Sequence, residues 1–225
     1  MHILLFDIDG TLVSSGGAGK AAIEDALAAE FGVVVRAQVS YSGRTDRAIS
    51  GDLLRLHGVE DSAATWQRLL TAYLRRLPAT LAGHHGQVLP GIAALLEHLS
   101  RREGVALGLL TGNVREGARL KLGHFGLFHH FAFGGFGDEH TDRDEVARSA
   151  LTAAHGHLNG AVAPERIWVI GDTPLDVRCA RAIGARAAAV ATGWHSTADL
   201  EAARPDLLLT DLSDPSPFLD RLDEA

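Results

Sequence analysis

Two aspartates directly follow the first apolar run of the chain. Asp7 and Asp9 come after the run Ile3–Phe6, and side chains two residues apart in an extended chain point to the same side. Two carboxylates that meet at the end of a buried strand repel each other unless a cation lies between them or one holds a proton. An acidic turn is the alternative, because Asp and Gly form turns. The full segment Asp-Ile-Asp-Gly-Thr favours a chemical site.

A second acidic pair follows a later apolar run. Asp172 comes after residues 167–170, directly before a predicted helix with Thr173 as its N-cap and Pro174 in its first position. Asp176 falls in the first turn, where the helix dipole alone would favour a carboxylate. Four carboxylates at two strand ends nevertheless predict an oxygen-rich pocket suited to Mg²⁺.

The segment Thr111-Gly112-Asn113 could hold an anion. It follows the apolar run 105–110, and Asn113 is predicted to cap a helix, with Glu116 three residues later as in a capping box. Free backbone N–H groups at such a helix start can bind a phosphate. Without the aspartates, an ordinary capped turn explains this segment equally well.

One arginine lies where a cation is unexpected. Arg143 stands among acidic residues at the predicted start of a helix, where its charge opposes the helix dipole. We therefore expect it to have another partner, such as a phosphate oxygen or the crowded carboxylates. Arg148 is the alternative position for this role, and a solvated arginine among acids is the simpler interpretation.

The elements that must position these residues alternate between apolar runs and amphipathic stretches. Continuous apolar runs are typical of parallel strands buried on both faces, and the pattern predicts an α/β fold with a doubly wound parallel sheet. In such a sheet ligands bind beyond the carboxyl ends of the strands. The predicted strands are residues 3–6, 105–110, 167–170, 187–191 and 207–209.

One segment interrupts the alternation. Between residues 14 and 85 no strand is predicted, and apolar periodicity indicates helices around residues 23–31, 49–56 and 66–77. We expect an all-helical cap subdomain at residues 15–85, inserted into a core formed by residues 1–14 and 86–225. Glycines at 83–86 and the Pro-Gly pair at 90–91 indicate the return connection.

Composition limits the possible partners. The chain has 225 residues, 46% of them hydrophobic, and a net charge of −7 without a basic run, which argues against a nucleic-acid partner. The single cysteine, Cys179, excludes an internal disulfide and fits a reducing compartment. No stretch has the length of a membrane span and the first residues do not resemble a signal peptide, so we expect a cytoplasmic protein without a membrane partner.

The order of these motifs resembles the haloacid dehalogenase superfamily, and within it the phosphoglycolate-phosphatase-type hydrolases. Four motifs over nearly the whole chain carry the resemblance: Asp7-Ile-Asp-Gly-Thr11, Thr111, Arg143 and Gly171-Asp-Thr-Pro-Leu-Asp176. The resemblance implies a Rossmann-like core with a helical C1-type cap. The loop Gly43-Arg44-Thr45-Asp46 is similar to the substrate-facing loop of such a cap, which makes Arg44 a candidate substrate ligand.

The resemblance also implies roles for the site residues. Asp7 would be the nucleophile and Asp9 the general acid and base. Mg²⁺ would be held by the side chains of Asp7 and Asp172 and the backbone carbonyl of Asp9, with Asp176 as a ligand or a support. Thr111, with Gly112 and Asn113, and the basic residue of the third motif would grip the phosphoryl oxygens. The sequence departs from the family pattern there, since Arg143 replaces the usual lysine.

The implied reaction is Mg²⁺-dependent hydrolysis of a small phosphorylated metabolite through an aspartyl-phosphate, by a monomer or homodimer. A dehalogenase would use the same nucleophile but needs neither Mg²⁺ nor Asp9. A sugar phosphomutase of the same superfamily would share every core residue and return the phosphoryl group to its substrate. A non-catalytic phosphate-binding protein is the alternative that is not an enzyme.

Overall fold

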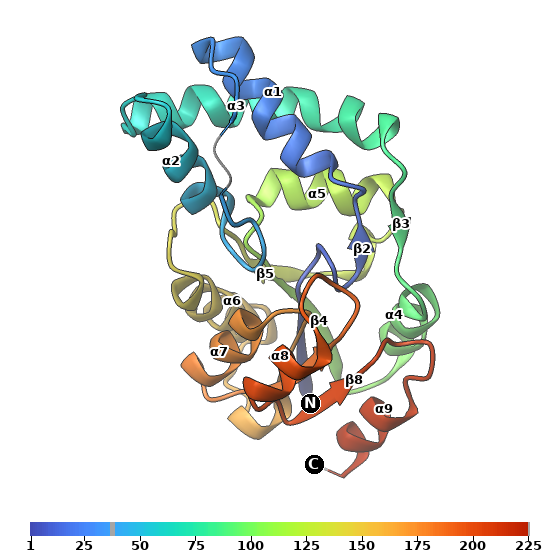
Figure 1. Cartoon of the computed structure of the whole chain (residues 1–225). Helices are drawn as coiled ribbons and strands as arrows, with labels where there is room; N and C mark the ends of the chain where they lie inside the picture. The colour runs from blue at the N-terminus through green and yellow to red at the C-terminus, as the bar shows by residue number, and fades with distance from the viewer. Residues whose placement is uncertain (37–38, 225) are drawn as a thin grey trace.

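The computed structural model describes residues 1–36 and 39–224. Residues 37–38, within the predicted cap, and residue 225, at the end of the predicted core, lie outside this description. The described chain forms a sheet flanked by helices, with a separate helical layer beyond one end of the strands (Figure 1).

Six parallel strands form the main sheet, in the order β5-β4-β1-β6-β7-β8. The sheet comprises β1 (His2–Phe6), β4 (Val105–Leu110), β5 (Phe133–Gly135), β6 (Ile167–Gly171), β7 (Arg186–Val190) and β8 (Leu207–Leu209). The five strands expected from the sequence are all present and parallel, which confirms the predicted fold class. The first strand lies in the middle of the sheet, between β4 and β6.

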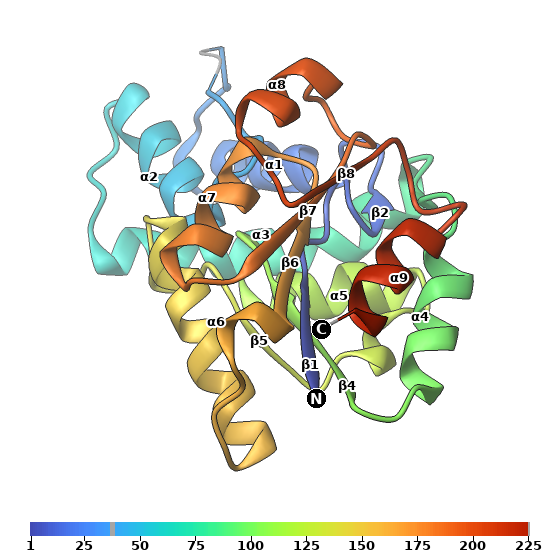
Figure 2. The ribbon, with the colours of Figure 1, turned by 90° about the horizontal axis from the view of Figure 1, so that it is seen from below.

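Alternate residues of β1 pack against different helical layers. Leu4 and Phe6 belong to the apolar cluster shared with α4 (Ile92–Arg101), α5 (Arg115–His124) and α9 (Ser216–Asp223). Ile3 and Leu5 belong to the cluster shared with α6 (Arg143–Leu158), α7 (Pro174–Ala182) and α8 (Thr197–Ala202). Figure 2 shows α4 and α9 on one side of the strands and α6 and α7 on the other. Among the described residues, no helix is both long and apolar enough to cross a membrane.

Strand β5 was not predicted, because two of its three residues are glycines, which have low strand propensity. Close packing explains them. A methyl group at Gly134 would lie 2.9 Å from Leu109 Cβ, and one at Gly135 would lie 2.3 Å from the carbonyl oxygen of Val146 in α6. The glycines therefore let the edge strand approach both β4 and α6.

The three helices expected between residues 14 and 85 are α1 (Ala18–Phe31), α2 (Asp46–Leu56) and α3 (Ala63–Gly83). They share an apolar cluster of their own, to which α5 contributes Val114 at its start. The chain enters and leaves this layer through an antiparallel pair, β2 (Val13–Ser14) and β3 (Gln87–Val88), which the sequence did not predict. We propose on this basis that residues 15–85 are the cap and residues 1–14 and 86–225 the core.

Candidate active site

The strand register brings three sequence motifs together at the carboxyl ends of the strands, which form one edge of the sheet. These motifs begin at Asp7, Thr111 and Asp172. Phe6 pairs with Leu109 of β4 on one side and with Ile170 of β6 on the other. The residues that follow these strands, including Asp7 and Asp172, therefore emerge side by side. The amide of Asp7 still donates to the carbonyl of Ile170 over 2.9 Å, which fixes its backbone at the end of the sheet.

Three buried carboxylates meet at this edge. Oxygen atoms of Asp7, Asp172 and Asp176 all lie within 4.8 Å of one another. Burial raises the pKa of Asp7 to about 6, with further contributions from the charges of Asp176 and Asp9, although Arg143 opposes the shift. Burial, Asp176 and Asp7 raise the pKa of Asp172 well above its ordinary value. Such a cluster has an electrostatic need for positive charge.

Asp172 is enclosed by two glycines. A methyl group at Gly10 would lie 2.4 Å from Asp172 Oδ2, and one at Gly193 would lie 1.7 Å from the same atom. The hydroxyl of Thr192 donates to the carbonyl of Gly10 over 2.6 Å and so joins the two glycine-bearing loops. Thr11 Oγ1 donates to Asp172 Oδ1 over 3.0 Å. These contacts hold the carboxylate in one place beside Asp7.

Asp176 forms a capping box at the start of α7. Thr173 is the N-cap and Pro174 the first helical residue, as predicted. The amide of Thr173 donates to Asp176 Oδ2 over 3.0 Å, and the Thr173 hydroxyl donates to the same oxygen over 2.8 Å. The other oxygen, Oδ1, accepts a bond from Arg143. Both carboxylate oxygens of Asp176 thus have protein partners.

Arg143 is the cation of this cluster. Its side chain is 4% exposed, and Nη2 lies 3.0 Å from Asp7 Oδ1 while also bonding Asp176. It begins α6, as predicted, and Asp142 caps that helix by accepting from the amide of Asp144 over 3.0 Å. Arg148, the alternative considered from the sequence, pairs with Glu145 on the same helix and is half exposed. The structure therefore brings Arg143, and not Arg148, to the carboxylates.

The helix cap predicted at Asn113 is wrong. Helix α5 begins at Arg115 with Val114 as its N-cap. Asn113 instead donates its side-chain amide to Asp9 Oδ2 over 2.8 Å and to Thr111 Oγ1 over 2.9 Å. A carboxylate is a better acceptor for this amide group than any group a helix start offers, since helix starts present N–H donors.

Some of the backbone donors expected for phosphate at this helix start already have acceptors. The amide of Val114 donates to Asp46 Oδ2 over 2.9 Å, and the amide of Arg115 donates to Asp138 Oδ2 over 2.9 Å. Thr111 itself follows β4 directly, and its amide pairs with the carbonyl of Gly135. The Thr111 hydroxyl accepts a hydrogen bond from the side-chain amide of Asn113, close to the carboxylates.

The side chain of Asp9 has partners other than the three-carboxylate cluster. Lys121 Nζ is 2.6 Å from Asp9 Oδ2, and Ser15 Oγ donates to Oδ1 over 3.2 Å. Partial burial would raise the pKa of Asp9, but the Lys121 ammonium and the hydrogen bonds from Lys121, Asn113 and Ser15 outweigh it and lower the pKa. The side chain of Asp9 therefore belongs to a separate polar group rather than to the three-carboxylate cluster.

Sequence reasoning missed Lys121. It lies in the middle of α5, and its side chain is 5% exposed. The signal was present, because Lys121 shares a helix face with the buried residues Gly117 and Ala118 at spacings of four and three. A lysine on the buried face of a helix requires an anionic partner, and here that partner is Asp9.

The cap loop at residues 43–46 contacts the core loop at residues 111–113. The amide of Asp46 donates to the carbonyl of Gly112 over 2.7 Å, and a methyl group at Gly112 would lie 2.1 Å from the carbonyl oxygen of Arg44. Arg44 Nη2 lies 2.6 Å from Asp52 Oδ2, and its Nη1 donates to the carbonyl of Ser40 over 3.2 Å. Arg44 thus lines the site but is paired within the cap.

A cavity of about 940 Å³ lies between the cap and the core at this edge. From the core it is lined by Asp7, Asp9, Gly112, Asn113, Lys121, Arg143 and Asp172, and from the cap by Arg44, Asp46 and Tyr73, among others. Trp194, the residue after Gly193, lies at the rim of the cavity and is 94% exposed. The predicted site residues thus border one cavity, except Thr111 and Asp176, which do not line it.

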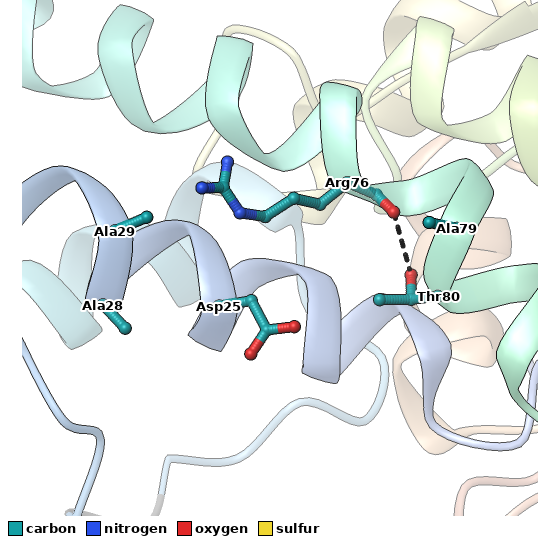
Figure 3. Close-up of a pocket in the computed structure, with 6 residues that line it drawn as sticks. All are labelled: Asp25, Ala28, Ala29, Arg76, Ala79 and Thr80. Atoms are coloured by element: carbon teal, nitrogen blue, oxygen red, sulfur yellow. Dashed lines mark hydrogen bonds between the residues drawn. The ribbon is translucent and has the colours of Figure 1, made fainter.

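A second hollow lies between α1 and α3 and is separate from this site (Figure 3). The two polar side chains that α3 contributes are engaged within that helix: Thr80 Oγ1 donates to the carbonyls of Leu77 and Arg76, and Arg76 Nη1 donates to that of Ala72. Three alanines form much of the remaining lining. It offers none of the carboxylate pairs found at the sheet edge.

The comparison with known families agrees with this geometry. Residues 1–184 match the model of the haloacid dehalogenase-like hydrolases. The chain belongs to this family, whose expected α/β core and helical insertion the structure contains.

Within the family, the chain is a phosphatase, that is, a phosphoric monoester hydrolase. It is 33% identical over 216 residues to the phosphoglycolate phosphatase of Synechococcus elongatus, with 95% of each chain covered. It is also 42% identical over 118 residues to the phosphoserine phosphatase of Thermus thermophilus, which covers 50% of this chain and 44% of the relative. The resemblance to phosphoglycolate-phosphatase-type hydrolases is thereby confirmed.

The structural comparison supports the same fold. The crystal structure of CbbY from Rhodobacter sphaeroides in complex with phosphate superposes with a TM-score of 0.75 at 22% sequence identity, covering 96% of each chain. At this level of identity the likeness concerns the fold, and it extends over the sheet and the helical insertion together.

Proposed function

We propose that the protein hydrolyses a small phosphate monoester in a Mg²⁺-dependent reaction that forms an aspartyl-phosphate on Asp7. One observation carries the proposal. The Asp7 carboxylate lines the cavity 3.0 Å from the Arg143 guanidinium and in one cluster with Asp172, while Asp9 lines the same cavity paired with Lys121. The proposed nucleophile Asp7, the cation Arg143 and a separate proton donor, Asp9, thus lie at the same end of the sheet.

The residues present fit a magnesium ion. The buried carboxylates of Asp7 and Asp172 are hard oxygen donors with raised pKa values, and Arg143 alone offsets only one negative charge of the cluster. Asp7, Asp172 and the backbone carbonyl of Asp9 would hold the ion, with Asp176 as a support because both its oxygens have protein partners. When bound, Mg²⁺ supplies positive charge that offsets the repulsion between the nucleophile and the phosphoryl group.

The first step transfers the phosphoryl group to the protein. An oxygen of Asp7 attacks phosphorus in line, a bond from that oxygen to phosphorus forms, and the bond to the leaving oxygen breaks. Lys121 lowers the pKa of Asp9 in the free protein, but the negative charge of a bound phosphoryl group favours its protonated form. Asp9 then gives its proton to the leaving oxygen. Arg143 holds the non-bridging oxygens from the cavity lining, and Thr111, which does not line the cavity, positions Asn113. A guanidinium can donate two parallel hydrogen bonds to phosphoryl oxygens, so an arginine can take the role that a lysine has in the family pattern.

The second step restores the protein. Asp9, now a carboxylate, takes a proton from a water molecule whose oxygen attacks phosphorus. The bond between phosphorus and Asp7 breaks, and inorganic phosphate leaves. Catalysis of this kind depends mainly on positioning and electrostatics, so the cavity between cap and core that positions these groups contributes to it.

We propose 2-phosphoglycolate as the first substrate to test. The relatives named above act, by their names, on phosphoglycolate and phosphoserine, and both compounds are small monoesters that carry a carboxylate. A cavity of about 940 Å³ between cap and core admits molecules of this size. We also propose that the enzyme works in the cytoplasm without nucleic-acid or membrane partners, as a monomer or homodimer.

Release of inorganic phosphate from a panel of phosphorylated metabolites tests the proposal. We expect hydrolysis of at least one small monoester with Mg²⁺, loss of activity with EDTA, and recovery when Mg²⁺ is added in excess. Analysis of the organic product separates hydrolysis from transfer of the phosphoryl group back to a sugar phosphate. Activity that is indifferent to EDTA contradicts the metal assignment, and a rearranged sugar phosphate without free phosphate indicates a mutase.

A further inference from the structure

Lys121 has a position that the proposed reaction does not explain. A buried ammonium next to the proton carrier is not needed for attack, for the phosphoryl grip or for the metal. We propose that Lys121 is a specificity-determining residue that binds a negatively charged group on the leaving side of the substrate. The enzyme would then favour phosphate monoesters of small hydroxy acids. The inference rests on the proposed function and names its substrate class.

The other described cations at the cavity are engaged elsewhere. Arg143 bonds Asp7 and Asp176 on the phosphoryl side. Arg44 is paired with Asp52 within the cap. Lys20 is 58% exposed and faces Glu24 one helical turn away. Of the positive side chains that line the described cavity, Lys121 is therefore the one next to Asp9, where the leaving group would lie. Its burial strengthens any electrostatic interaction it makes.

The distances place an anionic group within reach. Lys121 Nζ lies 2.6 Å from Asp9 Oδ2. The leaving oxygen must come within hydrogen-bond distance of Asp9 to receive its proton. A carboxylate on the carbon next to that oxygen is then close enough for the ammonium to bind it. An ammonium has three donors, so Lys121 can hold Asp9 and a substrate carboxylate together.

The charge around this position would otherwise repel such a substrate. Asp9 and Asp46 both flank Lys121, and the Asp7 carboxylate lies close by. A substrate carboxylate would face these acidic groups without compensation if the ammonium were absent. A neutral leaving group carries no such repulsion and gains little from Lys121.

A second donor faces the same side. Tyr73 of α3 is buried and lines the cavity, and its hydroxyl has no hydrogen-bond partner among the described residues. That hydroxyl lies 3.4 Å from where a methyl group at Gly117 would stand, one turn before Lys121 on α5. The unsatisfied hydroxyl is thus placed over the same helix face, where an anionic group would give it an acceptor.

The test compares two substrates of nearly equal size that differ in charge. We measure kcat/KM with saturating Mg²⁺ for 2-phosphoglycolate and for 2-hydroxyethyl phosphate. We expect the unsubstituted protein to prefer phosphoglycolate by at least about tenfold. Lys121→Met should remove most of this preference, and Lys121→Arg should retain it. Lys20→Met, which removes a cavity-lining but exposed lysine, should leave the ratio unchanged.

The outcomes separate the inference from the proposed function. A loss of activity in Lys121→Met that is equal for both substrates overturns the inference, because Lys121 then acts through Asp9 or through folding alone. An unsubstituted enzyme that hydrolyses 4-nitrophenyl phosphate without preferring phosphoglycolate to 2-hydroxyethyl phosphate also overturns it, even if no Lys121 variant folds. Absence of any phosphatase activity would instead refute the proposed function itself.

Discussion

Arg143 brings one guanidinium to two buried carboxylates, at the position where the family resemblance implied a lysine. Its Nη2 nitrogen lies beside both Asp7 and Asp176, so the same side chain orders Asp7 and the start of α7. Burial would lower the pKa of Arg143, but Asp176 and Asp7 outweigh it and raise the pKa, so the charge is permanent.

Replacing this arginine should therefore affect both stability and activity. Arg143→Met leaves buried carboxylates without their cation, and we expect a loss of about 3–5 kcal/mol in the free energy of unfolding together with loss of activity. Arg143→Lys retains a charge and should keep measurable activity. Chemical denaturation and phosphate release measure the two effects. Equal stability of Arg143→Met and the unsubstituted protein would contradict the role of Arg143 in the cluster.

At the scale of elements, helix α5 connects the sheet to the cap. Its first residues bond the cap through Asp46, its middle carries Lys121 to Asp9, and Leu122 packs in the core cluster. Figure 1 shows this helix directly between α1 and the sheet. The cap therefore meets the core through the same helix that holds Asp9, and changes at the contact should reach the site.

The contact at Asp46 should depend on pH. Burial raises the pKa of Asp46 to about 6, with Asp9 and Asp138 adding to the shift and Lys121 and the Val114 amide opposing it. A raised pKa means that Asp46 favours the folded state below about pH 4 and loses this contribution as pH rises through about 6. Asp46→Asn should then be more stable than the unsubstituted protein at pH 7.5, by at most about 3 kcal/mol.

Thermal unfolding of both proteins between pH 5 and 8 checks this expectation. The difference in Tm should shrink as the pH falls toward 5, because Asp46 becomes protonated in the folded protein. Asp138→Asn serves as a control, since Asp138 bonds the next amide of the same helix start from a partly exposed position. A Tm difference that is constant with pH, or that grows at low pH, contradicts the account.

The loop contact between Gly112 and Arg44 should govern closure of the cap. Gly112→Ala would place a methyl group 2.1 Å from the carbonyl oxygen of Arg44, so cap and core loops must separate. We expect a fall in kcat/KM of at least about tenfold, since closure excludes water from the site. Gly123→Ala on α5 is the matched control, because nothing lies within 4 Å of the added methyl group. Similar kinetics of the two variants would argue against this contact as a closing surface.

The sequence predicted structure correctly where a local pattern determines it, and less well where packing between distant segments determines it. The five apolar strands and the Thr173 cap follow from periodicity and capping chemistry, and the structure contains them. The edge strand β5 follows from close packing of Gly134 and Gly135, which no propensity indicates. Asn113 and Lys121 both turn toward Asp9, and that partner lies more than 100 positions away in the chain.

At the scale of the whole molecule, the family match and the carboxylate cluster predict a protein that Mg²⁺ stabilises. An ion that binds the folded chain alone adds about 2.7 kcal/mol at a concentration of 100 times its Kd. For a chain of this size that corresponds to a rise in Tm of roughly 5–10 °C. The rise should be small in Asp172→Asn, and sodium chloride at equal ionic strength should not reproduce it. No Mg²⁺-dependent shift in the unsubstituted protein would contradict the proposed ion site.

The central claim is that Asp7 becomes covalently phosphorylated in each turnover, and a rapid acid quench with ³²P-labelled substrate tests it most directly. We expect label to remain on the denatured protein in the first turnover, to map to the peptide that contains Asp7, and to be absent from Asp7→Asn. Rapid release of labelled phosphate without any labelled protein, or label on another residue, would contradict the account.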